Sequence, residues 1–528
     1  MQIVIPMSGF GDRFLRAGYD LPKPLIEIEG KPIIQHVVEM FPGESDITFV
    51  CNIDHLNEKK FQMRKILESI APECTIISIN PHKLGPIHAV LHAVDSLNLE
   101  IPTIVNYADF TCDWNYVDFC NSVEQTKCDG AIPCYRGFHP HTLWSNYYAY
   151  VPEKNMRAID IQEKKPFTDS PREEFASSGT YYFKSAKLMQ QYFNRCISDD
   201  LKVGGEYYAS MAYKPMIEDG LNIQVYELNH FMQWGTPSDL EEYRYWSDTF
   251  RSIINEQTPP KHKGALILPM VGLGSRFKEE GYMLSKPLIK VSGKPMAIQA
   301  LMDLPQTNTQ RFVLRKDMQG INQLQEIIQK KVNTAEFNIL DYLTDGQASS
   351  CIEGANGLKI IEPVTIGACD NGMTYDPDLF NSLMGSDNVD VIVWAVRGYP
   401  GAIRNPQMYG WIDADESGTI SQISVKTSLS NPISDPIVVG AFTFKKLEYF
   451  LQSVAHMKDR DAKVNGEYYV DTAINDAISL GLRCVLFEIE SYICWGTPND
   501  LKTFEYWQSC FSHWKSHPYQ LEKDRNTL

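Results

Sequence analysis

The sequence predicts an α/β protein of two tandem domains, each a mostly parallel mixed sheet covered by helices. The first observation is a long internal repeat. Residues 3–32 recur as residues 266–295, without a gap from Met7 and Met270 to Pro32 and Pro295. The second observation is that short apolar segments alternate with amphipathic ones within each half. Such alternation is typical of parallel strands joined by helices.

Three later segments also recur in the second half, at 135–138 and 396–399, at 202–208 and 463–469, and at 234–240 and 495–501. A repeat of this length indicates two whole domains rather than a solenoid. We expect the first domain at 1–253, a polar, proline-containing linker at 254–263, the second domain at 264–515 and a frayed polar tail at 516–528.

In the first half, residues 3–6 form an apolar strand that a glycine-rich turn closes. Residues 33–41 read as a helix, 47–52 as a strand, 88–94 as a helix and 103–106 as a strand before Asp109. Ligands of such sheets bind outside the carboxyl ends of the strands. The turn after residue 6 and Asp109 are therefore expected at the site.

Composition excludes several classes of function. Lys and Arg number 49 against 66 Asp and Glu, a net charge of −17, so general binding to nucleic acid or an anionic membrane is not expected. No apolar run is long enough to span a bilayer. The 12 cysteines form no C-x-x-C pair, and residues 1–6 lack the basic start of a signal peptide. These features favour a cytoplasmic protein with reduced thiols.

A glycine-rich turn followed by two cations stands after the first strand of each half. Its residues are Gly9, Gly11, Arg13 and Lys23, and then Gly272, Gly274, Arg276 and Lys286. Glycines let the backbone approach phosphates closely, and nearby cations neutralise a polyphosphate. An ordinary turn with solvated cations is the alternative, but recurrence with the same internal spacing favours a phosphate site. The pattern is neither the P-loop nor the dinucleotide fingerprint.

An aspartate follows a later apolar strand in both halves, Asp109 and Asp370. A carboxylate at a strand end is placed to hold Mg²⁺ between phosphates. The same residue could instead be a turn or helix-cap aspartate.

The pattern G-x-G-x-R followed by P-K-P-L-I-x-x-x-G-K-P resembles the signature of the sugar-1-phosphate nucleotidyltransferases, once in each half, with Ser285 in the second half where the first has Pro22. The resemblance implies Rossmann-like nucleotidyltransferase domains that join a nucleoside triphosphate to a phosphorylated sugar or polyol and release pyrophosphate, using Mg²⁺. It implies catalytic roles for Arg13, Lys23, Arg276 and Lys286, and metal binding by Asp109 and Asp370. Residues implied to bind nucleotide are Met7, Gly9, Gly11, Gly85, Met270, Gly272, Gly274 and Gly346.

The segment around Glu163 and Lys164 resembles the part of the family that lines the acceptor pocket. Residues implied to bind the acceptor are Glu163, Lys164, Gly179, Glu206, Lys426, Gly440 and Glu467. The second half keeps the lysine as Lys426 but lacks the glutamate, so we expect a change of acceptor between the halves. The loops around Gly85 and Gly346 also diverge, so the nucleotide could differ too.

The Trp-Gly-Thr-Pro motif departs from the family, which carries a metal-binding aspartate two residues before the glycine. Gln233 and Cys494 stand there instead. An amide is a weak Mg²⁺ ligand and a thiol a poor one. Another acid, such as Asp113 or Asp471, or phosphate and water would have to complete the metal shell.

Two other functions stay open. A nucleotide-sugar-dependent glycosyltransferase would need a D-x-D motif at a strand tip, and the copies at 376–378, 413–415 and 459–461 are poorly placed for this. Alternatively, one half could be catalytic and the other a nucleotide-sensing or scaffolding domain. The family resemblance favours a nucleotidyltransferase that activates a precursor for surface polysaccharide.

Overall fold

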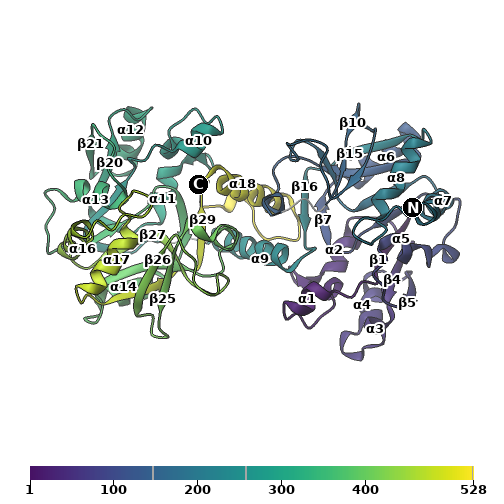
Figure 1. The fold of residues 1–528 in the computed structure, drawn as a ribbon, viewed down its shortest axis with the longest axis horizontal. Coiled ribbons are helices and arrows are strands. Elements are labelled where there is room, and N and C mark those ends of the chain that lie inside the picture. The colour runs from purple at the N-terminus through teal and green to yellow at the C-terminus, as the bar shows by residue number, and fades with distance from the viewer. Residues whose placement is uncertain (145–147, 256–257, 526, 528) are drawn as a thin grey trace. The chain divides into compact units, whose positions relative to one another are not determined.

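The computed structural model describes residues 1–144, 148–255, 258–525 and 527. It divides into two compact domains (Figure 1). The first comprises Met1–Tyr243 with Ser512–His517, and the second Arg244–Phe511 with Pro518–Leu528. Among the described residues, no helix has both the length and the apolar character that a membrane span requires.

The boundaries differ from the sequence-based ones. Residues 244–253 belong to the second domain, because Phe250 stacks on Phe504 with ring centroids 5.5 Å apart. The expected linker overlaps a strand that begins at Lys261. The tail was expected to be frayed, but Tyr519 and Asp524 within it are buried and hydrogen bonded to each other.

The first domain contains a mixed sheet with strand order β10-β11-β15-β8-β14-β6-β1-β4-β5. Strand β1 is parallel to β4 and β6, whereas β14 is antiparallel to β6 and β8. The expected α/β fold with a mixed sheet is confirmed, and the neighbouring strands β6, β1, β4 and β5 are parallel. Its strands are β1 (Gln2–Met7), β2 (Glu27–Ile28), β3 (Lys31–Pro32), β4 (Ile47–Asn52), β5 (Thr75–Ile79), β6 (Thr103–Asn106), β7 (Phe110–Asp113), β8 (Gly130–Tyr135), β9 (Ala149–Val151), β10 (Glu153–Lys154), β11 (Arg157–Ala158), β12 (Gln162–Glu163), β13 (Phe175–Ser177), β14 (Thr180–Phe183), β15 (Ile223–Glu227) and β16 (His230–Gln233).

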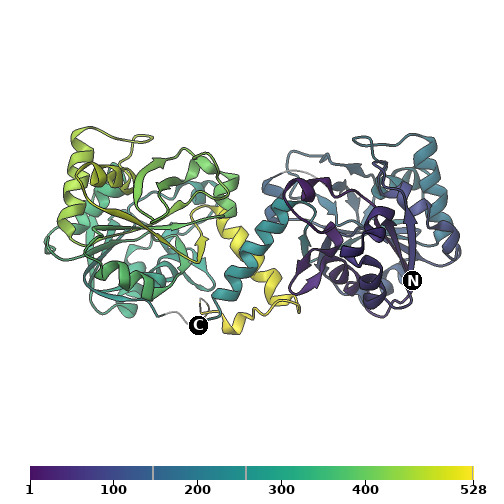
Figure 2. The same cartoon turned by 90° about the horizontal axis from the view of Figure 1, so that it is seen from below.

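Helices pack along this sheet (Figure 2). The expected helix at 33–41 is α2, and the one at 88–94 is α5, which starts earlier at Pro86. The helices are α1 (Asp12–Arg16), α2 (Ile33–Glu39), α3 (Ile53–Asn57), α4 (Met63–Ile70), α5 (Pro86–Leu91), α6 (Tyr116–Thr126), α7 (Ala186–Ser198) and α8 (Tyr213–Glu218).

The second domain repeats the central strand order. Its sheet runs β21-β20-β17-β22-β27-β24-β28, which matches β5-β4-β1-β6-β14-β8-β15 position by position. The strands are β17 (Lys261–Pro269), β18 (Lys290–Val291), β19 (Lys294–Pro295), β20 (Gln306–Arg315), β21 (Ala335–Leu340), β22 (Val364–Ile366), β23 (Asn371–Thr374), β24 (Val391–Val396), β25 (Gly410–Ala414), β26 (Ile420–Val425), β27 (Ile437–Phe444), β28 (Cys484–Glu488) and β29 (Ser491–Cys494). The helices are α10 (Ser275–Glu279), α11 (Met296–Asp303), α12 (Ile321–Lys331), α13 (Gln347–Ala355), α14 (Pro377–Gly385), α15 (Pro400–Arg404), α16 (Leu447–Asp459) and α17 (Val470–Ser479), with α9 (Pro237–Ser252) and α18 (Pro498–His513) crossing the domain boundaries.

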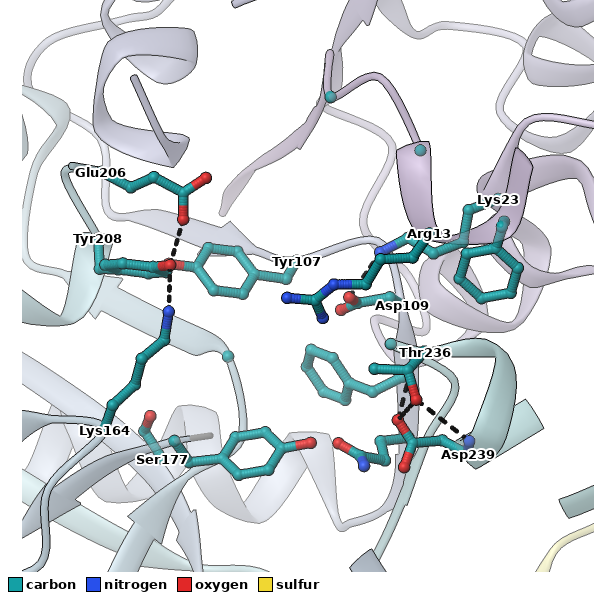
Figure 3. A pocket seen from close by; sticks show the side chains of 18 of the residues that line it. Arg13, Lys23, Tyr107, Asp109, Lys164, Ser177, Glu206, Tyr208, Thr236 and Asp239 are labelled. Carbon is teal, nitrogen blue, oxygen red and sulfur yellow. Dashed lines mark hydrogen bonds and ion pairs between the residues drawn. The ribbon is translucent and has the colours of Figure 1, made fainter. Parts of the chain in front are cut away.

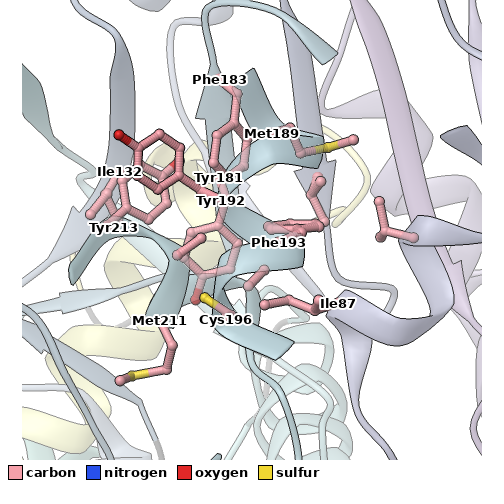
Figure 4. Packing of buried hydrophobic residues seen from close by; sticks show 14 of the residues in the cluster. Ile87, Ile132, Tyr181, Phe183, Met189, Tyr192, Phe193, Cys196, Met211 and Tyr213 are labelled. Atoms are coloured by element: carbon pink, nitrogen blue, oxygen red, sulfur yellow. The ribbon is translucent and has the colours of Figure 1, made fainter. Parts of the chain in front are cut away.

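A buried cluster under helices α7 and α8 holds the first sheet in place (Figure 4). Phe183 at the end of β14 stacks on Tyr213 of α8, with ring centroids 5.1 Å apart. Phe193 and Met189 of α7 are fully buried in the same cluster. Because β14 follows directly on Gly179, this packing fixes the edge of the site described next.

Candidate functional site

The first domain carries a cavity of about 500 Å³, and a second cavity of about 320 Å³ shares several of its wall residues. All eleven residues that the sequence implicates in this half line one cavity or both. Gly9, Gly11, Lys23, Asp109 and Glu206 line both. The larger cavity adds Arg13, Glu163, Lys164 and Gly179, and the smaller one adds Met7 and Gly85.

The glycine-rich turn delivers the cations to this cavity. Gly11 has a φ of +71°, a left-handed conformation that glycine adopts without steric cost, and it caps helix α1, which begins at Asp12. The Arg13 side chain then extends into the cavity (Figure 3). Lys23 Nζ lies 2.7 Å from Asp109 Oδ2. The structure thus brings the predicted cations and the strand-end aspartate to one place.

The Trp-Gly-Thr-Pro segment packs against Asp109. The backbone N–H of Trp234 donates to the Asp109 carbonyl oxygen at 2.7 Å. A Cβ on Gly235 would lie 3.3 Å from Asp109 Oδ2, tighter than most such contacts. This glycine therefore lets the segment approach the carboxylate closely.

Lys164, Tyr208 and Glu206 form a chain of hydrogen bonds along another wall (Figure 3). Lys164 Nζ donates to Tyr208 Oη at 2.5 Å, and Tyr208 in turn donates to Glu206. Tyr208 was not among the predicted site residues. Its recurrence as the second tyrosine of the repeated Gly-Glu-Tyr-Tyr motif is the signal that could have found it.

Glu163 lies beside Lys164 and is only 8% exposed. Burial raises its pKa to about 7, an effect that Glu206 reinforces and that Ser210 and Lys164 oppose. The Ser210 hydroxyl donates to Glu163 Oε2 at 2.6 Å. A carboxyl group near its titration point can either donate to or accept from a ligand hydroxyl.

The donor set around Asp109 can hold Mg²⁺ only together with a substrate. In the described residues, no group of three or more His, Cys, Asp or Glu side chains is arranged for a metal. Asp113, considered as a replacement ligand, pairs with His230 at 3.5 Å and lines neither cavity. Asp239 does line the larger cavity, but its carboxylate accepts a hydrogen bond from the Thr236 hydroxyl at the start of α9. Mg²⁺ is commonly bound by one or two carboxylates plus substrate phosphates, which fits Asp109.

The family model described as "Nucleotidyl transferase" matches residues 3–252. The first half of the chain is a nucleotidyl transferase domain.

Relatives of this nucleotidyl transferase domain include the "Bifunctional protein GlmU" of Ralstonia pickettii, 33% identical over 109 residues that cover 21% of this chain and 22% of that protein. The "Mannose-1-phosphate guanyltransferase" of Yarrowia lipolytica is 24% identical over 167 residues, which cover 31% of this chain and 45% of that one. The match thus spans about a fifth of the GlmU relative. A solved nucleoside-diphosphate-sugar pyrophosphorylase from Vibrio cholerae covers 45% of this chain and 98% of its own, with 20% identity and a TM-score of 0.38.

The second domain repeats the ion pair between Lys23 and Asp109 of the nucleotidyl transferase domain. Lys286 Nζ lies 2.5 Å from Asp370 Oδ2 and 2.9 Å from the carbonyl oxygen of Gly496. Burial lowers the pKa of Lys286, but the Asp370 and Cys369 side chains outweigh it, so the net pKa is raised. Gly274 repeats the left-handed cap with a φ of +63°. Met270 and Gly272 lie in the loop between β17 and α10.

A backbone clamp recurs where the nucleotidyl transferase domain carries Gly85. There, a Cβ would lie 2.7 Å from the backbone nitrogen of Tyr207. On Gly346 the same atom would lie 2.5 Å from the nitrogen of Tyr468. Both glycines have positive φ, +89° and +133°. The loops around Gly85 and Gly346 differ in sequence, but both pack against the backbone of the following Gly-Glu-Tyr-Tyr segment so closely that only glycine fits.

The charged residues that the resemblance implicates in acceptor binding in the second half also lie near one another. Burial lowers the pKa of Lys426, Asp471 and Glu467 oppose that shift, and Arg276 adds to it, so all four lie within electrostatic reach. Lys426 Nζ lies 5.4 Å from the centroid of the Tyr469 ring. Gly440 has a φ of +81°, and its Cβ would lie 3.3 Å from that of Ala368.

Cys494, at the second-ligand position, is buried, and burial together with Asp500 and Asp370 raises its pKa. A thiol is a poor ligand for Mg²⁺, so this position does not supply the second carboxylate that the family carries. Asp471, the other acid considered as a metal ligand, lies beside Lys426 and Gly410.

Proposed function

We propose that the first domain transfers a nucleotidyl group from a nucleoside triphosphate to a phosphorylated sugar or polyol and releases pyrophosphate. The observation that carries the proposal is the convergence of Arg13, Lys23 and Asp109 with Lys164 and Glu163 on one cavity. The nucleotidyl transferase family of this domain and its sugar-nucleotide relatives support it.

In the proposed reaction, an oxygen of the acceptor phosphate attacks the α-phosphorus of the triphosphate. The bond from this phosphorus to the oxygen bridging to the β-phosphorus breaks, and pyrophosphate leaves with the electron pair. Arg13 and Lys23 stabilise the charge that develops on the departing group. Lys164 pairs with the acceptor phosphate, and Glu163 hydrogen-bonds an acceptor hydroxyl. Most of the rate comes from positioning and electrostatics.

Asp109 would hold Mg²⁺ against the phosphates, and the ion would supply charge neutralisation there. Lys23 keeps the Asp109 carboxylate oriented toward the cavity through their 2.7 Å ion pair. The product would be a nucleotide-activated sugar or polyol, suited to building a surface polysaccharide. Nucleoside triphosphates and the free cysteines of the described chain both suit a cytoplasmic setting.

A second function is favoured for the second domain by Cys494, a buried thiol at the position where the family carries a metal-binding aspartate. That domain would bind nucleotide and regulate the first without catalysing transfer. Separate Asp109→Ala and Asp370→Ala variants distinguish the two. Loss of turnover in the first alone assigns catalysis to the first domain.

The test is a screen of pyrophosphate release with each common nucleoside triphosphate against a panel of phosphorylated sugars and polyols, with Mg²⁺. We expect at least one productive pair, abolished by EDTA and by Asp109→Ala. Asp113→Asn is the matched control, because Asp113 lies on the adjoining strand β7 but lines neither cavity. Folded protein that releases no pyrophosphate with any pair would refute the proposal.

A further inference from the structure

The acceptor walls of the two domains differ by a matched set of three residues. In the first domain, Glu163 of β12 pairs across the sheet with Ala149 of β9. In the second, Val425 of β26 pairs with Gly410 of β25 in the same way. The lysine that follows each confirms the alignment: Lys164 N donates to the Tyr148 carbonyl at 2.9 Å, and Lys426 N to that of Tyr409 at 3.0 Å.

The third member is the residue that faces this strand pair from the Gly-Glu-Tyr-Tyr segment. It is Ser210 in the first domain and Asp471 in the second, each two residues after the second tyrosine. Tyr207 N donates to the Leu84 carbonyl at 2.9 Å and Tyr468 N to that of Asp345 at 2.8 Å, so the two segments are anchored alike. Ser210 and Asp471 therefore hold equivalent places.

The carboxylate thus comes from a strand in the first domain and from the start of a helix in the second. In the first domain it is Glu163 on the strand, with Ser210 as its hydrogen-bond donor. In the second, the strand carries the apolar Val425, and the carboxylate is Asp471 at the start of α17. Within the described residues, no side chain donates a hydrogen bond to the Asp471 carboxylate. Lys426 is close enough to interact with it electrostatically.

The absence of a side chain at Gly410 leaves the space that the Asp471 carboxylate occupies. A Cβ at Gly410 would lie 2.4 Å from Asp471 Oδ2 and 3.4 Å from Cγ2 of Ile423. The first domain accommodates Ala149 at this place because Ser210 is smaller than aspartate. A decaying site would lose its carboxylate, whereas here the loss of one acid accompanies a new acid and the space to hold it.

We propose that the second domain has its own acceptor site, in which Asp471 takes the place of Glu163 and selects a different phosphorylated sugar or polyol. This inference rests on the proposed function, because it assumes that the equivalent wall of the first domain binds such an acceptor. Lys426 pairs with the ligand phosphate, and Asp471 accepts from hydroxyl groups presented on the helix side. The two domains therefore recognise different hydroxyl arrangements in one chemical class.

The test measures direct binding of the phosphorylated sugar and polyol panel to the full chain by calorimetry. We expect Asp471→Asn to weaken one subset of ligands about tenfold or more, the effect of losing a charge-assisted hydrogen bond. Ligands that depend on Glu163, identified with Glu163→Gln, should be unaffected. Asp413→Asn is the matched control, because Asp413 lies on β25 with an exposed side chain.

The triple variant Gly410→Ala/Val425→Glu/Asp471→Ser reproduces the set of the first domain. We expect it to lose the Asp471-dependent ligands and to gain a second equivalent of the Glu163-dependent ones. It also keeps the test decisive if Asp471→Asn fails to fold, because the first domain already packs this combination.

Unchanged affinities for every ligand in both folded variants would overturn the inference while leaving the proposed function intact, provided that Glu163→Gln still weakens its own subset. A chain that binds no member of the panel and releases no pyrophosphate would overturn both.

Discussion

Lys23 Nζ lies 2.7 Å from Asp109 Oδ2, and Lys286 Nζ lies 2.5 Å from Asp370 Oδ2. Each pair joins the glycine-rich turn after the first strand to the end of a later strand in the same sheet. The pair places a cation and a carboxylate together where we propose that the phosphates bind. The same lysine–aspartate pair thus recurs in both domains.

Lys23→Ala should lower pyrophosphate release by roughly 10²- to 10³-fold, the loss that follows removal of a preorganised electrostatic contact. Lys286→Ala tests the second domain in the same assay. Lys65→Ala is the control, because Lys65 is exposed on α4 away from both cavities. Equal turnover in Lys23→Ala and Lys65→Ala would remove Lys23 from the mechanism.

Gly85→Ala should weaken nucleotide binding and lower the free energy of unfolding by about 1–3 kcal/mol. Its Cβ would collide with the Tyr207 backbone at 2.7 Å, and its φ of +89° disfavours alanine. Gly43→Ala separates these causes, since Gly43 has a φ of +92° with nothing within 4 Å of the added Cβ. Thermal melts measure the loss of stability, and nucleotide titrations measure the loss of affinity. Identical results for Gly85→Ala and Gly43→Ala would show that the collision with the Tyr207 backbone has no effect.

Glu163→Gln should gain stability over the native chain as the pH rises. The pKa of Glu163 is raised by burial from 4.5 to about 7, so its contribution to stability is complete below about pH 4.5 and is lost as the pH passes through 7. The neutral amide avoids that loss, which amounts to about 3 kcal/mol. Denaturant unfolding at several pH values measures the difference, with Glu124→Gln on the exposed face of α6 as control. A difference that does not vary with pH would contradict the raised pKa.

Tyr519→Ala should destabilise the second domain by about 3 kcal/mol or more, as large-to-small changes of buried aromatic residues do. Tyr519 is 1% exposed, and its ring lies 4.8 Å from that of Phe250. Tyr342→Ala, at a 48% exposed tyrosine of the same domain, is the control. Melting curves that show equal effects would mean that the terminal segment adds little to the domain.

Much of the candidate site was predictable from the sequence because its residues stand in short motifs that recur in both halves, most of them following a strand. The glycines, Arg13, Lys23 and Asp109 follow apolar strands, and the carboxyl ends of such strands share one edge of a sheet. Tyr208 was missed because its role depends on Lys164, which lies 44 residues earlier in the chain. Asp113 was considered as a replacement ligand, but it stands at the far end of β7 from Asp109, pairs with His230 and lines neither cavity.

Short motifs and their repetition were enough to predict the doubled α/β architecture and the residues of each expected phosphate site, because both are encoded by spacing over a few residues. The ends of each domain, the pairing of acids with lysines and the space that Gly410 leaves for Asp471 are visible only in the folded chain. Those features depend on packing between segments far apart in the chain, and no local pattern of residues records such contacts.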